Sequence, residues 1–321
     1  MILNGTDTMS FSKKELTTTV KNICANEGFS KVGIAKAEKL TEEEPYFKKW
    51  LTKEMNGDMK WMNNSFEKRL DPRRIDENIR SVISLAYLYD TPVLHSNDTN
   101  IPKISRYAWG KRDYHKVLKK KLKSVCRSIE ELSPEIKTWS YVDDGPVMDK
   151  AWAVRSGIGW MGKHTNVINP DIGSFFFLCD IFLNFELEYD EPIGDLCKNC
   201  TLCINACPTG AIYDEYKLDA NLCISYQTIE NRNGIPDDIS LEGWIFGCDI
   251  CQDVCPYNGR KVFTNDDNFY PRIDVINKTF DEQLGMTEEE FNTIFEGTPI
   301  RRTKYSGWMR NLKKAKQKVL H

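Results

Sequence analysis

The stretch that decides the fold is Cys197-Lys-Asn-Cys200-Thr-Leu-Cys203-Ile-Asn-Ala-Cys207-Pro208, followed by Cys248-Asp-Ile-Cys251-Gln-Asp-Val-Cys255-Pro256. Cys223 lies between the two runs. Three thiolates spaced three residues apart can hold one corner of an iron–sulfur cube, and a fourth that precedes proline points toward a second cube. The two runs and Cys223 together supply the cysteines that two 4Fe–4S clusters need.

The spacing predicts a crossed arrangement, in which the cysteine before each proline serves the cluster of the other run. One cluster is then held by Cys197, Cys200, Cys203 and Cys255, and the other by Cys207, Cys223, Cys248 and Cys251. Zinc is the alternative, but zinc sites usually use two separated C-x2-C pairs. A triple followed by Cys-Pro favours iron and sulfur.

Length and composition limit the kind of protein that can surround these cysteines. The 321 residues allow two domains and a tail, and 40% apolar with 28% charged residues is typical of a globular protein. The N-terminus has no signal-peptide pattern, and the most apolar run, 174–183, is too short to span a bilayer. We expect a cytoplasmic protein without a membrane partner, whose remaining cysteines are reduced and buried: Cys24, Cys126 and Cys179.

Hydrophobic periodicity before the cysteines predicts a layered α/β domain. Helices are expected from Ser12 to Gly28, Thr41 to Gly57, Asp113 to Leu132 and Pro146 to Ser156, with strands over 31–35, 81–89, 138–142 and within 174–189. A capped helix is expected after Thr287 and a basic helix over 300–319. The expected class is therefore α+β: a layered domain in 1–190, a ferredoxin-like domain with the clusters in 191–262, and a short helical, basic tail in 263–321.

Positive charge is concentrated in two segments, although the net charge is −3. Residues 103–127 hold ten basic residues against the single acid Asp113, and 301–321 hold eight basic residues and no acid. This asymmetry indicates a surface that faces a polyanion. For Lys116–Lys123 taken alone, a solvated helix face is the better interpretation.

Two further motifs are ambiguous. Gly157-Ile-Gly159-Trp-Met-Gly162 fits the dinucleotide motif G-x-G-x-x-G, but it follows a predicted helix rather than a strand. A nicotinamide site is therefore disfavoured. The better interpretation is a glycine-rich helix stop whose backbone another group can approach closely. Asp113-Tyr-His115 begins like a corrinoid D-x-H-x-x-G motif, but Leu118 replaces the required glycine. His115 and His164 stay open as ligands or acids, and a hydrogen-bonded structural role is the ordinary interpretation.

Asp143 ends a predicted strand, just before Asp144, Gly145 and Pro146. Two adjacent carboxylates in a buried loop would repel each other, and a protonated one could act as a general acid. Helix capping is the alternative, and Asp144 suits that role. The residues alone do not decide between the two roles.

Several stretches together resemble one family over about residues 30–312. With the cysteine block, and in this order, they are similar to cobalamin-dependent epoxyqueuosine reductases: Arg106-Tyr-Ala-Trp-Gly-Lys-Arg-Asp-Tyr-His115, Val142-Asp-Asp-Gly-Pro146, Gly157-Ile-Gly-Trp-Met-Gly-Lys-His-Thr165, Gly173-Ser-Phe-Phe-Phe-Leu178, Cys223-Ile-Ser-Tyr226 and Gly247-Cys-Asp-Ile-Cys-Gln252.

The resemblance implies an activity, cofactors and site residues. The family reduces the epoxide of epoxyqueuosine, at the wobble position of the tRNA anticodon, to the alkene of queuosine. Its N-terminal domain holds base-off cob(II)alamin, which receives electrons through the two 4Fe–4S clusters. Asp143 opens the family's D-x-G/A-P motif and would be the proton donor. By motif position, cobalamin contacts would fall at Arg69, Arg106, Asp143, Val167, Leu178 and Ser225.

The resemblance also implies partners. These are tRNAs with GUN-type anticodons, for aspartate, asparagine, histidine and tyrosine, and an external electron donor; we expect the chain to act as a monomer. Many members carry helical repeats after the ferredoxin domain, whereas this sequence stops at His321, and Asp144 replaces a residue that is often small. Two alternatives are a corrinoid reductive dehalogenase, which the basic tail disfavours, and an electron-transfer ferredoxin, which the long preceding domain disfavours.

Overall fold

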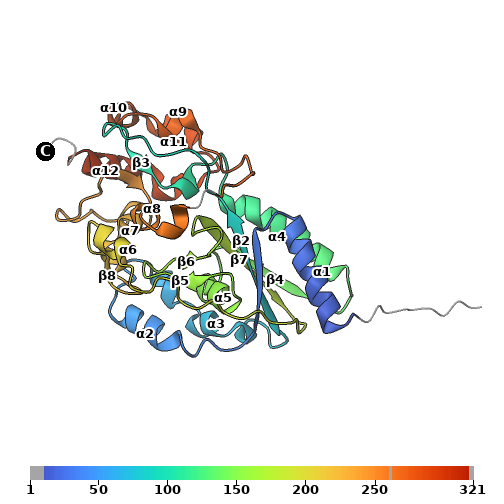
Figure 1. Cartoon of the computed structure of the whole chain (residues 1–321). Helices are drawn as coiled ribbons and strands as arrows, with labels where there is room; N and C mark the ends of the chain where they lie inside the picture. The colour runs from blue at the N-terminus through green and yellow to red at the C-terminus, as the bar shows by residue number, and fades with distance from the viewer. Residues whose placement is uncertain (1–10, 260–261, 318–321) are drawn as a thin grey trace, which may run out of the picture.

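A four-stranded antiparallel sheet forms the centre of the N-terminal part in the computed structural model, which describes residues 11–259 and 262–317 (Figure 1). The strand order is β1-β2-β7-β4. The strands are β1 (Lys31–Lys36), β2 (Ser81–Leu88), β7 (Phe176–Leu183) and β4 (Thr138–Tyr141). Every residue of β2 is buried, as its continuous apolar run predicts for a central strand.

Helices cover both faces of this sheet. Successive strand residues point to opposite faces, so Ile83 packs with α1 (Lys13–Asn26) and α4 (Tyr114–Glu130), whereas Val82 packs with α2 (Glu44–Thr52), α3 (Phe66–Leu70) and α5 (Asp149–Arg155). Figure 1 shows α1 and α4 on one side of the sheet and α5 on the other. The predicted layered α/β arrangement is confirmed.

Local capping signals predicted some helix boundaries correctly and others wrongly. Ser12 forms the capping box of α1, Asp113 caps α4, and Thr287 caps α11 (Glu288–Ile294). By contrast, α2 begins at Glu44 and its N-cap makes no side-chain bond, so the predicted start at Thr41 is wrong. The helix expected from Pro146 begins only at Asp149, since residues 143 and 145 adopt positive φ angles of 48° and 74°.

The cysteine block and the C-terminal helices share one core. The block contains α6 (Leu202–Ala206), β8 (Ile212–Asp214), β9 (Lys217–Leu218), α7 (Ile224–Ile229), β10 (Trp244–Phe246) and α8 (Ile250–Asp253), and β10 pairs in parallel with β3 (Lys103–Ile104). The C-terminal helices are α9 (Ile273–Ile276), α10 (Phe280–Leu284), α11 and α12 (Lys304–Lys316). Trp109, Trp244 and Trp308 lie in one apolar cluster that draws on all three parts of the chain.

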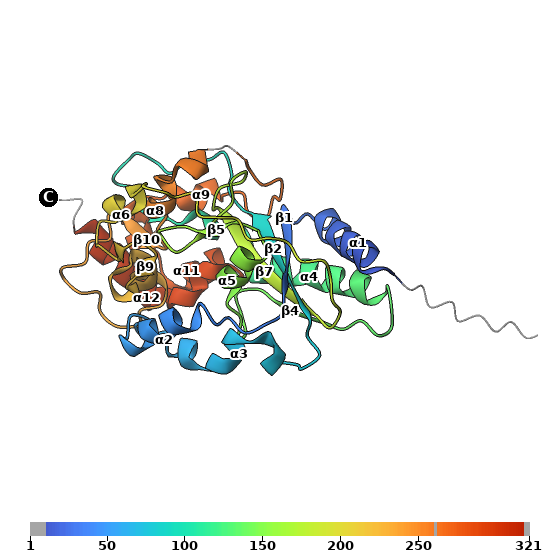
Figure 2. The ribbon, with the colours of Figure 1, turned by 60° about the horizontal axis from the view of Figure 1, so that its bottom comes forward.

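This core crosses both expected domain boundaries, at residues 190 and 262. The division into three parts stays a prediction. Figure 2 shows the cysteine block and the C-terminal helices together, beside the sheet with α1 and α4. The terminal helix α12 is shorter than the predicted 300–319; residues Pro299–Thr303 form a 3-10 turn, and Val319 lies outside the described residues. Among the helices described, none is both long and apolar enough to cross a membrane.

Candidate functional site

The structure groups the predicted cluster cysteines into two sets. The first set, which is Cys197, Cys200, Cys203 and Cys255, lines one small cavity together with Pro256 and Tyr257. The charges of Cys197 and Cys200 both act on Cys255. In the second set, the charge of Cys207 raises the pKa of Cys223, and the charge of Cys223 raises the pKa values of Cys248 and Cys251. Cys203 of the first set also raises the pKa of Cys251, so the two sets are neighbours. Cys255 therefore lies with the first run rather than with its neighbours in sequence.

Asp143 lies in the exposed loop between β4 and α5. Its side chain is 64% exposed, and its Oδ2 accepts a hydrogen bond from the Tyr114 hydroxyl. The same oxygen is 3.8 Å from His115 Nε2. Tyr114 and His115 begin α4 and stack with ring centroids 4.0 Å apart. The Asp143 carboxylate is thus held at the N-terminus of α4, where the helix dipole favours an anion.

Asp144 has other partners. Its Oδ1 accepts a hydrogen bond from the Val142 N–H at 2.8 Å, and its Oδ2 is 2.6 Å from Lys119 Nζ. The N-cap of α5 is Met148, which makes no side-chain bond. The predicted capping role of Asp144 is therefore wrong, and so is the expectation of a buried loop, because the backbone turns the two carboxylates toward different partners.

Lys150 belongs to α5 and lies near both the Asp143 loop and the cysteine block. Its side chain is exposed, and its Nζ donates to Thr165 O and Asn166 Oδ1, both at 2.9 Å. Desolvation lowers the pKa of this ammonium, and the negative charges of Asp143, Cys251 and Cys223 raise it. Asp143 and two cysteines of the second set are therefore close enough to Lys150 to influence its charge.

Three of the predicted cofactor contacts lie beside the sheet and the cysteine block. Val167, in β6 (Val167–Ile168), and Leu178, in β7, belong to one apolar cluster. The backbone N–H of Ser225 donates to the Cys223 sulfur. These positions suit a group with a large apolar face that lies near the second set.

Two predicted arginine contacts are held by other groups. Arg69 donates to the backbone carbonyls of Asn64, Trp61 and Val147 at 3.3, 3.4 and 3.4 Å, and so supports the loop before α5. Arg106 pairs with Asp249 and Asp253, with Nη1–oxygen distances of 3.2 and 2.6 Å, and so ties its turn to the second cysteine run. Their roles as cofactor contacts stay predictions.

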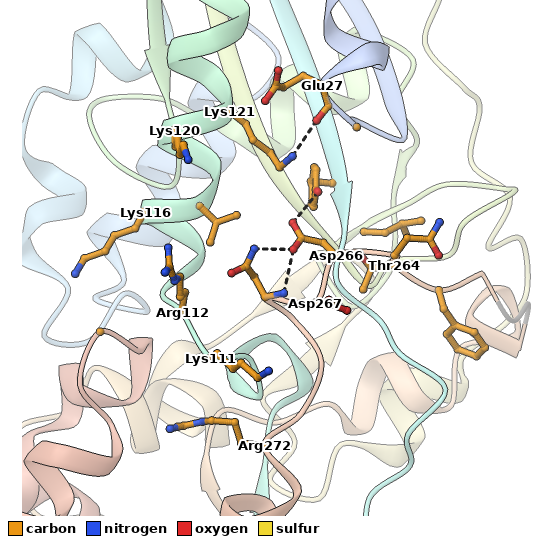
Figure 3. A pocket seen from close by; sticks show the side chains of 18 of the residues that line it. Glu27, Lys111, Arg112, Lys116, Lys120, Lys121, Thr264, Asp266, Asp267 and Arg272 are labelled. Atoms are coloured by element: carbon orange, nitrogen blue, oxygen red, sulfur yellow. Dashed lines mark hydrogen bonds between the residues drawn. The ribbon is translucent and has the colours of Figure 1, made fainter.

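A basic groove of about 1430 Å³ opens beside α4 (Figure 3). Its walls are α4, the end of α1, and the segments 263–268 and 293–297. Within the described chain, none of its six basic side chains forms an ion pair with a carboxylate; Lys121 and Arg272 donate to backbone carbonyls, and the other four are Lys111, Arg112, Lys116 and Lys120. The groove also contains four acids, Glu27, Asp266, Asp267 and Glu296, and Asp266 accepts a hydrogen bond from the Tyr87 hydroxyl at 2.9 Å. Lys116 follows His115 directly, so the groove begins next to the Asp143 loop.

The basic tail offers fewer unpaired charges to a polyanion than its sequence suggests. Arg302 pairs with Glu230 at 2.8 Å, Lys316 pairs with Asp281, and Lys314 lies 3.6 Å from Asp237. Arg310 donates to the backbone carbonyls of residues 227, 231 and 233. Acids distant in sequence thus pair with three basic residues of the tail, Arg302, Lys314 and Lys316. Lys116 and Lys120, which belong to the segment expected to be a solvated helix face, are exposed and line this groove.

Sequence reasoning missed Tyr114 and Lys150 as members of the site. Tyr114 lies inside a stretch that carried the family resemblance, which was the available signal. Lys150 gave no signal, because an exposed lysine near a helix start is ordinary in sequence. Of the two histidines, His115 lies near Asp143, whereas His164 lines the cavity of the first cysteine set.

Comparisons with known families match two parts of the chain. Residues 196–258 match the 4Fe-4S double cluster binding domain, and residues 69–144 match the family described as epoxyqueuosine reductase QueG, DUF1730. An epoxyqueuosine reductase of Cellulophaga algicola is 42% identical over 94% of this chain and 98% of its own length. That of Escherichia coli K12 is 36% identical over 93% and 80%.

Solved structures agree with these matches. A selenomethionine-labelled epoxyqueuosine reductase superposes with a TM-score of 0.88 at 26% identity, over 96% of this chain and 83% of that one. An epoxyqueuosine reductase with an epoxyqueuosine-modified tRNA-Tyr stem loop gives 0.86 at 27%, over 96% and 82%. The Bacillus subtilis protein, with its aspartate catalytic loop swung out of the active site, gives 0.86 at 26%, over 96% and 82%.

Proposed function

Because this chain belongs to the epoxyqueuosine reductase family, it reduces epoxyqueuosine in tRNA to queuosine, and we propose that this happens in a recess beside Lys150. The observation that carries the proposal is the position of Lys150. The charges of Asp143, the proposed proton donor, and of Cys251, a proposed cluster ligand, both raise the pKa of the Lys150 ammonium, so both groups lie near it. A reduction that consumes electrons and protons needs these two supplies at one place.

Two 4Fe–4S clusters fit the cysteine block, in the crossed arrangement. The first set lines its own cavity, and the second set lies nearer to Lys150. We therefore assign electron entry, from an external donor, to the first cluster, and electron delivery to the second. Only the second lies beside the recess in which the substrate reacts.

The recess also fits a cobalamin. It combines an apolar cluster that contains Val167 and Leu178 with the polar groups of Lys150 and Ser225, and it adjoins the second cluster. Arg69, Arg106 and Asp143 complete the proposed contacts. When bound, base-off cob(II)alamin would, once reduced through the clusters, supply a low-valent cobalt able to break a carbon–oxygen bond of the epoxide.

Asp143 is the proposed proton donor. Its Oδ2 accepts the hydrogen bond of Tyr114, and its side chain is exposed enough to meet a substrate. Protonation of the epoxide oxygen makes it a better leaving group. The complete reaction takes up two electrons and two protons, forms the alkene and releases the oxygen as water. The exposed loop allows Asp143 to approach the substrate, as the loop movement of the Bacillus subtilis relative indicates.

The groove beside α4 suits the phosphates of the tRNA anticodon stem. His115 lies at the mouth of the recess, and Lys116 and Lys120 continue along α4 into the groove. Residues four apart on a helix are separated by about 6 Å along its axis. A wobble nucleoside bound in the recess therefore places its neighbouring phosphates along this row of lysines.

Charge reversal in the groove is expected to weaken tRNA binding. The double substitution Lys116→Glu, Lys120→Glu should raise the Kd for an anticodon stem loop by about tenfold or more, because it replaces phosphate attraction by repulsion. The slope of log Kd against log salt should become shallower by about 0.7 for each phosphate contact that is lost. Fluorescence anisotropy over a salt series measures both effects.

The control for this experiment changes the charge elsewhere. Lys14 and Lys137 are exposed and lie outside the groove, so Lys14→Glu, Lys137→Glu alters the net charge equally. The control should bind almost as the parent does. If both double variants weaken binding by the same factor, the effect reflects overall charge and the groove is not the tRNA surface.

The remaining partners are proposals of the same kind. We propose tRNAs with GUN anticodons, for aspartate, asparagine, histidine and tyrosine, as substrates, and a monomer as the working form in the cytoplasm. The tRNA-Tyr stem loop bound by a relative supports one of the four. We also retain the division into a cobalamin domain (1–190), a cluster domain (191–262) and a basic helical tail (263–321).

A further inference from the structure

The glycine-rich segment 157–164 has no part in the reaction described above, yet the structure places it against the first cysteine set. Gly157, with φ of 73°, ends α5, and β5 (Trp160–Met161) then pairs with β6. A Cβ on Gly159 would lie 2.2 Å from Ile168 O. The segment therefore stops the helix and packs tightly on its own chain, which leaves no space for a dinucleotide at this backbone.

Trp160 makes a direct contact with a cluster ligand. Its ring is 2% exposed, and its Nε1 donates a hydrogen bond to Cys197 Sγ at 3.4 Å. Tyr257 fixes the indole from the side, with ring centroids 4.8 Å apart and planes at 75°. An indole N–H is only a donor, so sulfur is the acceptor in this contact.

His164 offers a second donor to the same cavity. Its side chain is 3% exposed and lines the cavity with the four first-set cysteines. The Asn166 N–H donates to Nδ1 at 3.1 Å, so this nitrogen is an acceptor and the ring proton is assigned to Nε2. Nε2 is buried and finds no partner among the residues described.

A buried donor needs an acceptor. The other side chains around this cavity are aliphatic groups, Pro256, Tyr257 and the four cysteines, and the group that fits four cysteines carries sulfur acceptors. A sulfur of the first cluster would accept a hydrogen bond from the His164 Nε2–H, just as Cys197 Sγ accepts one from the Trp160 indole N–H. The unpaired Nε2 thereby supports both the cluster in this cavity and a role for the histidine.

We propose that Trp160 and His164 donate hydrogen bonds to the sulfurs of the first cluster and raise its reduction potential. The inference rests on the proposed cluster assignment. Reduction adds negative charge to a cluster, and N–H groups aimed at its sulfurs stabilise that charge. The first cluster becomes easier to reduce, which suits the point at which a donor delivers electrons. The glycine-rich segment is thus a cluster-tuning element supplied by the layered domain.

The test is a redox titration, followed by electron paramagnetic resonance, of anaerobically purified full-length protein. Trp160→Phe keeps an aromatic ring and removes the N–H, so the midpoint potential of the first cluster should shift to more negative values. His164→Phe should shift it in the same direction, and the double variant further. His164→Gln retains a donor and an acceptor, and its shift should be smaller.

The control is Trp308→Phe. Trp308 is also buried, and within the described residues its indole nitrogen has no partner, so this change trims an aromatic side chain without removing a sulfur contact. Both potentials should stay unchanged. Iron analysis accompanies each titration. If Trp160→Phe loses iron, the titration of His164→Phe decides alone.

Two failures are distinguishable. Full iron content with unchanged first-cluster potential in Trp160→Phe and His164→Phe would overturn this inference and leave the clusters in place. Parent protein that holds zinc, or a single cluster, after anaerobic purification would instead overturn the cluster assignment itself.

Discussion

Asp143→Asn is expected to keep both clusters and tRNA binding, and to lower turnover by at least about 10²–10⁴-fold. That factor is the usual contribution of general acid catalysis. An asparagine can still accept the Tyr114 hydrogen bond through its amide oxygen, so the loop should keep its position, but it has no acidic proton to transfer. The measurement is conversion of epoxyqueuosine in an anticodon stem loop under reducing conditions.

Asp144→Asn is the matched control for that experiment. An amide oxygen keeps the bond from the Val142 N–H, and only the pairing with exposed Lys119 is lost. Such surface pairs contribute little to stability, so the rate should change by less than about threefold. Near-parental turnover in Asp143→Asn, or a larger loss in Asp144→Asn, would move the acid elsewhere. His115, 3.8 Å from Asp143, would then be tested first.

Cys255→Ser is expected to remove the first cluster and spare the second. Cys255 is buried in the cavity of Cys197, Cys200 and Cys203, although Cys248 and Cys251 are closer in sequence. Iron content should fall from about eight to about four atoms per chain. The spectrum of the reduced protein should lose the signals of the first cluster. Turnover should fall to near background, because electrons would lose their entry point.

Cys126→Ser provides the control, because this half-buried thiol lies in α4, outside the cysteine block. Its iron content should match that of the parent. Loss of the second cluster with an intact first cluster in Cys255→Ser would show that the crossed arrangement is wrong. Loss of both clusters would show that the second cluster depends on the first.

The cysteine spacing correctly predicted a 4Fe–4S binding domain, and the strand pattern correctly predicted the strands of the central sheet, because both are local properties of the sequence. The Asp143 loop shows where local reasoning ends. Asp144 has the chemistry of a helix cap, yet the positive φ angles at residues 143 and 145 delay α5 and turn Asp144 toward Lys119. Lys119 belongs to α4, and no local sequence pattern around Asp144 predicts this pairing.

Surfaces assembled from distant segments were the least predictable. The basic groove combines parts of the chain around residues 27, 116, 266 and 296, and some basic residues of the tail pair with distant acids such as Glu230 and Asp281. The glycine-rich segment was correctly predicted to stop a helix. Its contact with Cys197 depends on the packing of the layered domain against the cysteine block, and spacing alone does not encode that packing.

The central claim, that this chain reduces epoxyqueuosine through cluster-reduced cobalamin, has one direct test. Cluster-loaded protein is prepared without oxygen, with and without added cobalamin, and given a chemical reductant and an epoxyqueuosine-modified tRNA-Tyr stem loop. Nucleoside mass analysis follows the loss of one oxygen. The account predicts queuosine only with cobalamin present, and its absence with the Asp143→Asn variant. Equal conversion without cobalamin, or none by fully loaded parent protein, would contradict it.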